Sequence, residues 1–232
     1  MNIDKSKVDS LIFDMDGTLW DAMKSYAEVW NVAFGELGLA ITVDESVLKQ
    51  AIGSTIDDIL VMLSRRYGLA IESKRFLARV DEIEDALLPV IGGVPYPGVQ
   101  EGIRRLAERY RIFLLSNCGA NGLPNFMRFT GITDYIDDYL SYGMRRGTKS
   151  ENLSYLKQKH GLKMPVYVGD TQSDCNNAHQ SGMPFVYASY GFGNCEGYDL
   201  KVDKFAEIVD FFLETKNDER QHEQYHIQGM GR

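Results

Sequence analysis

The sequence is poor in the features that mark secreted and membrane proteins. Its 232 residues include three cysteines, which are widely separated and match no zinc-site spacing. Such sparse cysteine is typical of a protein from a reducing compartment without disulfide bonds. No run approaches the roughly 18 apolar residues of a membrane-spanning helix, and the polar N-terminus lacks the apolar segment of a secretory signal. The sequence therefore predicts a cytoplasmic protein that does not enter a membrane.

Basic residues are outnumbered by acidic ones. Lys and Arg total 25 against 33 Asp and Glu, which gives a formal net charge of −8. This excess of acid disfavours nucleic acid or an anionic membrane as a partner. It is compatible with a phosphorylated small molecule if a metal ion supplies positive charge locally. The hydrophobic content of 44% suffices for a packed core and argues against disorder.

Hydrophobic spacing separates a helical block from the rest of the chain. A short apolar run at residues 8–13 predicts a buried strand. Residues 22–88 carry apolar side chains at helical spacing, so we expect helices there and no strand between Leu19 and Pro89. Glycine and proline then cluster over residues 92–98, which predicts a hinge or linker.

Beyond this cluster, predicted helices and strands alternate. The expected helices cover 99–110, 122–129, 152–160, 175–181 and 205–213, and the expected strands cover 112–115, 139–142, 166–168 and 185–187. Alternation of this kind predicts an α/β fold, a Rossmann-like parallel sheet with helices on both faces. The predicted organisation is a core of residues 1–19 and 94–232, an inserted helical domain at 20–93, and a polar C-terminal tail at 216–232.

Polar residues follow the expected strands where each one ends. In chain order they are Asp14 and Asp16, then Ser116 and Asn117, then Lys149, and finally Asp170 and Asp174. Ligands of open parallel sheets bind beyond the carboxyl ends of the strands, so we expect these side chains to meet at one edge. Each motif alone has an ordinary explanation as a turn or a helix cap. An EF-hand is a poor match because Leu19 stands where that loop has glycine.

This combination resembles the haloacid dehalogenase superfamily of phosphohydrolases over nearly the whole chain. The run 14–19 is similar to the first motif of that family. Ser116, Lys149 and the run 169–174 are similar to its second, third and fourth motifs, in the same order. The inserted helices are similar to the small helical cap of phosphoglycolate phosphatases and β-phosphoglucomutases. The resemblance implies a cap that closes over the active site.

Two positions depart from the family pattern. Trp20 stands where a smaller aliphatic residue is common, and Ser150 stands where relatives often have proline. We expect neither to touch the chemistry, although Trp20 could reshape the pocket. The implied hinges of the cap lie near residues 19–21 and 92–98, and residues 53–55 are a candidate substrate contact within the cap.

The resemblance implies a role for each motif residue. Asp14 would be the nucleophile that attacks phosphorus and forms an aspartyl-phosphate. Asp16 would protonate the leaving alcohol and later activate water as a base. Ser116 and Lys149 would bind the phosphoryl oxygens, and Asn117 is a candidate for the same task.

The resemblance also implies a Mg²⁺ site formed by Asp14, the main-chain carbonyl of Asp16, Asp170 and Asp174. A charge count supports the ion, because four carboxylates and a phosphate dianion total about −6 against +1 from Lys149. Like charges about 4 Å apart repel by on the order of 4 kcal/mol at an effective dielectric near 20. We therefore expect the ion to be obligatory and the crowding to raise the pKa of Asp16.

The function expected from this resemblance is a Mg²⁺-dependent phosphatase acting on a small phosphorylated metabolite. A phosphosugar mutase with the same nucleophile is the alternative, and hydrolysis is favoured because the cap shows no distinct sugar-binding signature. A dehalogenase is disfavoured because its chemistry does not need an acid at Asp16. A non-catalytic phosphate-binding protein is disfavoured because a suitable residue stands at every acidic and basic position of the four motifs.

Arg65 and Arg66 are expected to form a solvated helix face rather than to bind a second anionic group. The substrate and the oligomeric state stay open.

Overall fold

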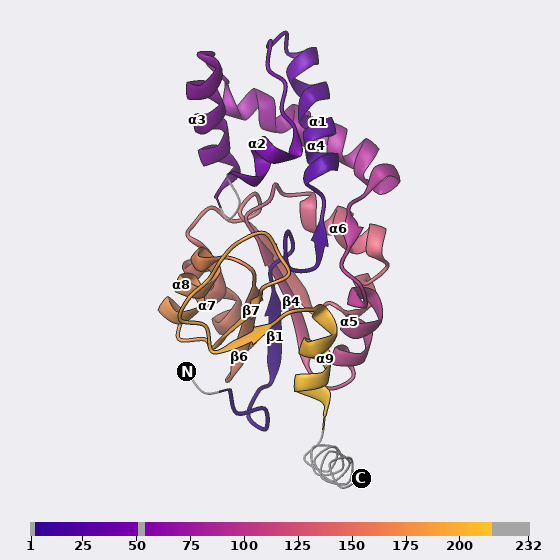
Figure 1. Ribbon diagram of the computed structural model, residues 1–232, viewed down its shortest axis with the longest axis vertical. Coiled ribbons are helices and arrows are strands. Elements are labelled where there is room, and N and C mark those ends of the chain that lie inside the picture. Colours follow the sequence, from indigo (N-terminus) through magenta and orange to yellow (C-terminus); the bar gives the residue numbers. More distant parts are fainter. Residues whose placement is uncertain (1–2, 51–53, 215–232) are drawn as a thin grey trace, which may run out of the picture.

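The computed structural model describes residues 3–50 and 54–214 and places a block of helices above a sheet-containing core (Figure 1). The predicted tail at 216–232 and the candidate contact Gly53 lie outside these residues. The core sheet has six strands in the order β5-β4-β1-β6-β7-β8, and all its pairings are parallel. The strands are β1 (Ser10–Phe13), β4 (Arg111–Ser116), β5 (Asp138–Ser141), β6 (Pro165–Gly169), β7 (Phe185–Ala188) and β8 (Leu200–Val202). The predicted Rossmann-like α/β fold is confirmed.

Helices cover both faces of this sheet. They are α5 (Val99–Ala107), α6 (Gly122–Thr130), α7 (Lys149–His160), α8 (Gln172–Gln180) and α9 (Phe205–Leu213). The central strand β1 shows why two layers are needed, because its alternate side chains point to opposite faces. Leu11 and Phe13 pack with α5, α6 and α9, whereas Ile12 packs with α7 and α8. All three side chains are fully buried.

The strand order fixes where a ligand can bind. The chain runs from β1 outward to β4 and β5, and then crosses back to β6 on the other side of β1. The connection after β4 leads to β5 and the connection after β6 leads to β7, so the two run in opposite directions. This divergence opens a crevice at the carboxyl end of β1. Crevices of this kind are where open α/β sheets bind their ligands.

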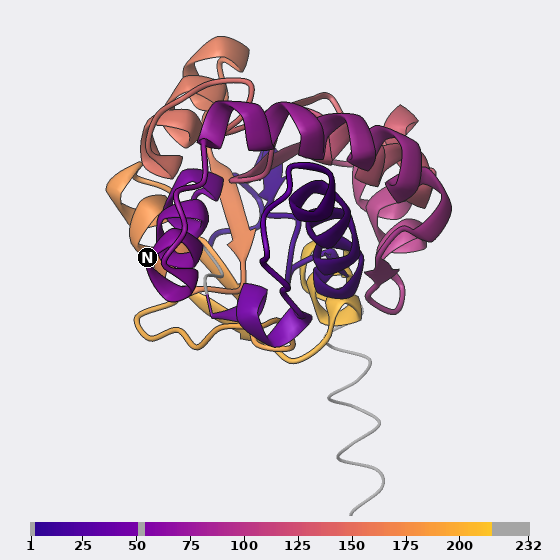
Figure 2. The same ribbon diagram turned by 90° about the horizontal axis from the view of Figure 1, so that it is seen from above.

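The helical block lies over this crevice and has a hydrophobic core of its own. It consists of α1 (Met23–Glu36), α2 (Glu45–Lys49), α3 (Ile56–Tyr67) and α4 (Ser73–Ile91). Seen from above, these helices surround the space over the sheet (Figure 2). Phe34 stacks on Phe76 with ring centroids 4.6 Å apart, and Trp30 meets Phe76 edge-on at 5.3 Å. This aromatic cluster joins α1 to α4.

The chain enters and leaves the helical block through a short antiparallel pair, β2 (Trp20–Asp21) and β3 (Val94–Pro95). The prediction that no strand lies between Leu19 and Pro89 is therefore wrong. A strand of two residues has no alternation that a sequence pattern can reveal. The pairing brings the two predicted hinge regions side by side.

Polar contacts tie the helical block to the core on two sides. The Tyr142 hydroxyl, just after β5, donates to Asp57 at the start of α3 at 3.1 Å, and Arg146 forms an ion pair with the same carboxylate. On the other side, the side-chain amides of Asn121 and Asn125 donate to Asp85 of α4 at 3.1 and 3.3 Å.

No helix within residues 3–50 and 54–214 has both the length and the hydropathy that crossing a membrane requires.

Candidate active site

Asp14 stands at the end of the central strand. Its main-chain N–H donates to the carbonyl of Val168 at 2.9 Å, which continues the ladder between β1 and β6 by one residue. The side chain is buried at the floor of the crevice. The position of Asp14 is thus set by the central strand of the sheet.

The loop after Asp14 turns sharply and packs against the loop after β6. Gly17 adopts φ = 82°, and a Cβ atom there would lie 2.2 Å from Oδ2 of Asp170. Glycine is therefore required both by the backbone conformation and by the close approach. Asp170 is held from the far side as well, because the main-chain N–H of Phe192 donates to its Oδ2 at 2.8 Å. Residues 191–193 are therefore part of the wall that positions Asp170.

Asp16 is held by the residue that departs from the family pattern. The indole N–H of Trp20 donates to Oδ1 of Asp16 at 3.0 Å. The expectation that Trp20 does not touch the chemistry is therefore wrong. The tight turn after β1 brings Trp20 back beneath Asp16, where its ring is fully buried against Phe126.

Asp174 is oriented by the start of helix α8. Thr171 caps this helix and forms a capping box with Asp174, whose Oδ2 accepts from the Thr171 main-chain N–H at 3.1 Å. The other oxygen, Oδ1, accepts from Lys149 at 2.6 Å and from the Tyr167 hydroxyl at 3.2 Å. Both oxygens of Asp174 are thus engaged within the protein.

Lys149 is the first residue of helix α7, which begins earlier than the predicted residue 152. Thr148 and Glu151 form a capping box that fixes this start. The buried ammonium group lies 3.1 Å from Asp14 Oδ1 and 2.6 Å from Asp174 Oδ1. Burial alone would lower the pKa of Lys149, but the two carboxylates outweigh it and raise the pKa. Lys149 therefore carries its positive charge at the floor of the site.

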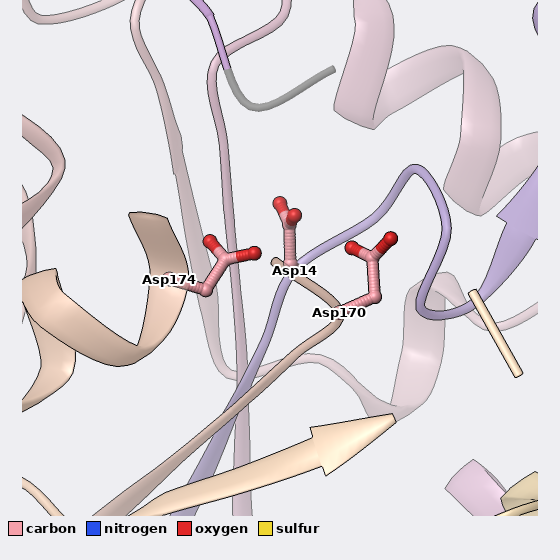
Figure 3. Close-up of side chains that lie close together, drawn as sticks. All are labelled: Asp14, Asp170 and Asp174. Atoms are coloured by element: carbon pink, nitrogen blue, oxygen red, sulfur yellow. The ribbon is translucent and has the colours of Figure 1, made fainter. Parts of the chain in front are cut away.

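Three carboxyl groups converge beside this lysine. Asp14, Asp170 and Asp174 each offer an oxygen, and these oxygens lie within 4.8 Å of one another. Figure 3 shows the three side chains pointing into the same space from β1, from the loop after β6 and from α8. Oxygen ligands of this kind suit a hard divalent cation. The carboxyl group of Asp16 is not in this cluster, and its predicted contribution to the ion is its main-chain carbonyl.

The electrostatics of the site favour a bound cation. Burial is the main cause that raises the pKa of Asp14 to about 8; Lys149 opposes the shift, and Asp174 and Asp170 add to it. Burial, with the neighbouring Asp174, also raises the pKa of Asp170 to about 7. A cation bound between these groups would restore their ionised forms.

The pKa of Asp16 is also raised, and hydrogen bonding limits the shift. Burial and then the charge of Asp14 raise the pKa of Asp16 to about 7, while the hydrogen bond from Trp20 holds it lower than it would otherwise be. A carboxyl group with a pKa near the working pH is suited to give and take a proton. The predicted rise in the pKa of Asp16 is therefore present.

A cavity of about 120 Å³ lies between these residues and the helical block. Its floor includes Asp14, Asp16, Ser116, Asn117 and Lys149, so the structure brings the residues of the first three motifs together. The roof comes from the helical block and includes Met23, Tyr26, Trp30, Leu48, Ile59 and Glu84. The volume suits a small metabolite.

Glu84 and Tyr26 are site residues that the sequence reasoning did not find. Glu84 carried a signal, because it follows Val80 by four residues and precedes Leu88 by four on the apolar face of α4. An acidic side chain in such an apolar stripe is rarely buried unless it has a partner or a functional role. Tyr26 carried none, since a tyrosine in the apolar stripe of α1 looks like a core residue.

Comparison with known proteins assigns the family. The model of the haloacid dehalogenase-like hydrolases matches residues 11–188, well over half of the chain. The chain belongs to the haloacid dehalogenase-like hydrolase family. The suspected membership is thus confirmed.

Several curated relatives of this chain are phosphoglycolate phosphatases. The chain is 25% identical over 225 residues to the phosphoglycolate phosphatase of Rhodospirillum rubrum, covering 87% of this chain and 90% of the relative. It is 27% identical over 216 residues to that of Synechococcus elongatus, covering 90% and 94%. The crystal structure of a predicted phosphoglycolate phosphatase from Haemophilus somnus superimposes with a TM-score of 0.76 at 24% identity, covering 88% of this chain and 98% of that one. This structural likeness supports the haloacid dehalogenase-like fold.

Proposed function

We propose that this protein is a Mg²⁺-dependent phosphatase that hydrolyses a small phosphate monoester through an aspartyl-phosphate on Asp14. One observation carries the proposal. Asp14 lies 3.1 Å from the buried ammonium of Lys149 and also belongs to the cluster of three carboxyl groups. A nucleophilic carboxylate that is flanked by a fixed cation and a candidate metal site is what attack on a phosphate anion requires. The curated phosphoglycolate phosphatases add support for ester hydrolysis.

Asp14, Asp170 and the main-chain carbonyl of Asp16 would hold the metal ion. Asp174 would act on it less directly, because its oxygens already accept from Lys149, Tyr167 and Thr171. When bound, Mg²⁺ would neutralise the phosphoryl oxygens and keep the carboxylates ionised. Magnesium is favoured over softer metals because the candidate ligands are all oxygens.

In the first step, a carboxylate oxygen of Asp14 forms a bond to phosphorus while the bond from phosphorus to the ester oxygen breaks. Lys149 and the polar groups of Ser116 and Asn117 would bind the phosphoryl oxygens and offset their charge. Asp16 donates its proton to the departing alkoxide, which leaves as the alcohol. The negative charge of the ester oxygen is thereby removed as it forms.

In the second step, Asp16 takes a proton from a water molecule whose oxygen attacks phosphorus. The bond between phosphorus and Asp14 then breaks and inorganic phosphate leaves. A pKa near 7 lets Asp16 serve as the acid in the first step and as the base in the second. The buried Trp20 indole keeps the Asp16 carboxyl in place for both proton transfers.

We further propose that residues 20–93 form the cap, with hinges at β2 and β3. The contacts of Asp57 with Tyr142 and Arg146 would hold the closed arrangement and keep bulk water out. These contacts are polar and at least partly exposed, so they can break and re-form at low cost. The three cysteines are free thiols, consistent with the proposed cytoplasmic location.

The proposal is tested by hydrolysis of an aryl phosphate with Mg²⁺ and with EDTA. We expect turnover to need Mg²⁺ and to fall about a thousandfold or more in Asp14→Asn. Asp134→Asn, which makes the same change at an exposed position, is the control and should keep full activity. Activity that persists in EDTA or in Asp14→Asn would contradict the proposal.

A further inference from the structure

Glu84 of α4 is a buried acidic residue that takes no part in the proposed reaction. Its side chain is 5% exposed and faces the same cavity as Asp14 and Lys149. Among the described residues, no hydrogen-bond donor or cation acts on its carboxyl group; the charges that do are those of Asp81, Asp16 and Asp85. Burying a carboxyl group without a partner is costly, so a native structure that does so usually has a reason.

The hydroxyl group of Tyr26 is a second polar group at the roof of this cavity. Its oxygen is buried and makes no hydrogen bond of normal geometry within the described chain, although it lies near enough to Asp16 to lower the pKa of that carboxyl group. The charge of Glu84 also acts on it. Tyr26 belongs to α1 and Glu84 to α4, so two separate helices present polar groups at the roof of one cavity. A ligand that enters the cavity would supply the missing partners.

The charged residues around the cavity limit which charged groups a bound substrate can have. Among the described residues that line the cavity, Lys149 is the one cation, and Asp14 and Asp174 already pair with it. Residues 51–53 are Ala, Ile and Gly and bring no charge. Arg65 and Arg66 are exposed and do not line the cavity, in line with the solvated face predicted for them. A second anionic group on the substrate would therefore meet Glu84 with no cation to offset it.

We propose that Glu84, together with Tyr26, selects a phosphate monoester whose alcohol part carries a hydroxyl or amino group and no second anionic group. This inference rests on the proposed phosphatase function. A hydroxyl group can donate to or accept from Glu84 and Tyr26 in either protonation state, and an ammonium group pairs with the ionised carboxylate. Phosphoglycolate, from which the curated relatives take their name, carries a carboxylate and is the kind of ester that this cavity disfavours.

The test compares three small esters that differ in the group beyond the phosphate. The wild-type protein with Mg²⁺ is assayed above pH 8, where Glu84 is ionised, on glycerol 3-phosphate, phosphoethanolamine and 2-phosphoglycolate, and free phosphate is measured. We expect kcat/KM for each of the first two esters to exceed that for 2-phosphoglycolate by at least about tenfold. A kcat/KM for 2-phosphoglycolate equal to or above the other two overturns the inference.

Substitution then assigns the preference to Glu84. Glu84→Gln keeps the shape and removes the acid, so the ratio of kcat/KM for phosphoethanolamine to that for 2-phosphoglycolate should fall by about tenfold or more. Glu82→Gln, the same change on the exposed face of α4, is the matched control and should leave the ratio unchanged. An unchanged ratio in Glu84→Gln, or an equal fall in both variants, overturns the assignment.

Binding separates this inference from the proposed function. Calorimetric titration of Asp14→Asn with the same three esters and Mg²⁺ measures affinity without turnover. If the wild type hydrolyses none of the esters and no aryl phosphate, the proposed function fails. The inference still stands if the first two esters bind at least about tenfold more tightly than 2-phosphoglycolate. Equal or tighter binding of 2-phosphoglycolate, or no binding of any ester, overturns it.

Discussion

The buried Glu84 contributes to the pH dependence of stability in the metal-free protein, and Glu84→Gln should remove that contribution. Burial is the main cause that raises the pKa of Glu84 from 4.5 to about 8, followed by the charges of Asp81, Asp16 and Asp85. Between these two pH values the native protein keeps a proton that the unfolded chain has released. The free energy of unfolding contributed by this group therefore falls as the pH rises through this range.

The size of the effect follows from the shift. Each unit of difference between the folded and unfolded pKa is worth about 1.4 kcal/mol, so the penalty grows by up to that amount for each pH unit. From pH 5 to pH 7 the advantage of Glu84→Gln over the wild type should grow by about 2–3 kcal/mol. Above the folded pKa the penalty is complete and the difference should level off.

The assay is urea unfolding of both proteins in EDTA at several pH values from 5 to 8, with the difference in unfolding free energy plotted against pH. Glu82→Gln, on the exposed face of the same helix, is the control. It should differ from the wild type by less than about 1 kcal/mol at every pH, because the exposed pair with Arg79 is weak. A Glu84→Gln difference that stays flat across this range would refute the burial argument.

Three further predictions concern the floor of the site. Asp16→Asn should slow the first step, the transfer of the phosphoryl group to Asp14 measured in a single turnover, by about 10²–10⁴ with an alkyl phosphate but much less with an aryl phosphate, whose leaving group needs little protonation; equal losses in this step would contradict the role of an acid. Lys149→Met leaves Asp14 and Asp174 buried without their cation and should lower the free energy of unfolding by about 3–5 kcal/mol in urea without metal, and a change below about 1 kcal/mol would argue against the ion pairs. Trp20→Phe removes the hydrogen bond that lowers the pKa of Asp16, so the alkaline limb of the pH profile of kcat/KM should move to higher pH; an unmoved limb would show that the indole does not act on this acid.

The sequence predicts the core of this fold well because each core strand has a clear pattern. The apolar runs that end at Phe13, Leu115 and Val168 lie in β1, β4 and β6, and the last predicted helix matches α9 at both ends. Polar residues at the ends of these strands then identify the site, because parallel topology gathers strand ends at one edge. The short strands β2, β3 and β8 escaped prediction, since a few residues carry too little periodicity.

The contacts across the crevice could not be read from the sequence. That Trp20 donates to Asp16 depends on how the turn after β1 folds back, and no pattern of residue types encodes it. That Glu84 faces the site depends on how α4 is rotated over the sheet, which is set by the packing of Phe76 on Phe34. Local patterns specify the elements, whereas tertiary packing decides which side chains meet.

Trapping the covalent intermediate tests the central claim most directly. The protein is mixed with Mg²⁺ and an excess of a hydrolysed ester, quenched with acid during turnover, digested, and its peptides are weighed by mass spectrometry. We predict one added phosphoryl group on the peptide that contains Asp14, and none on that peptide in Asp14→Asn. A wild-type Asp14 peptide that stays unmodified during turnover, or an Asp14→Asn protein that still turns over, would contradict the account.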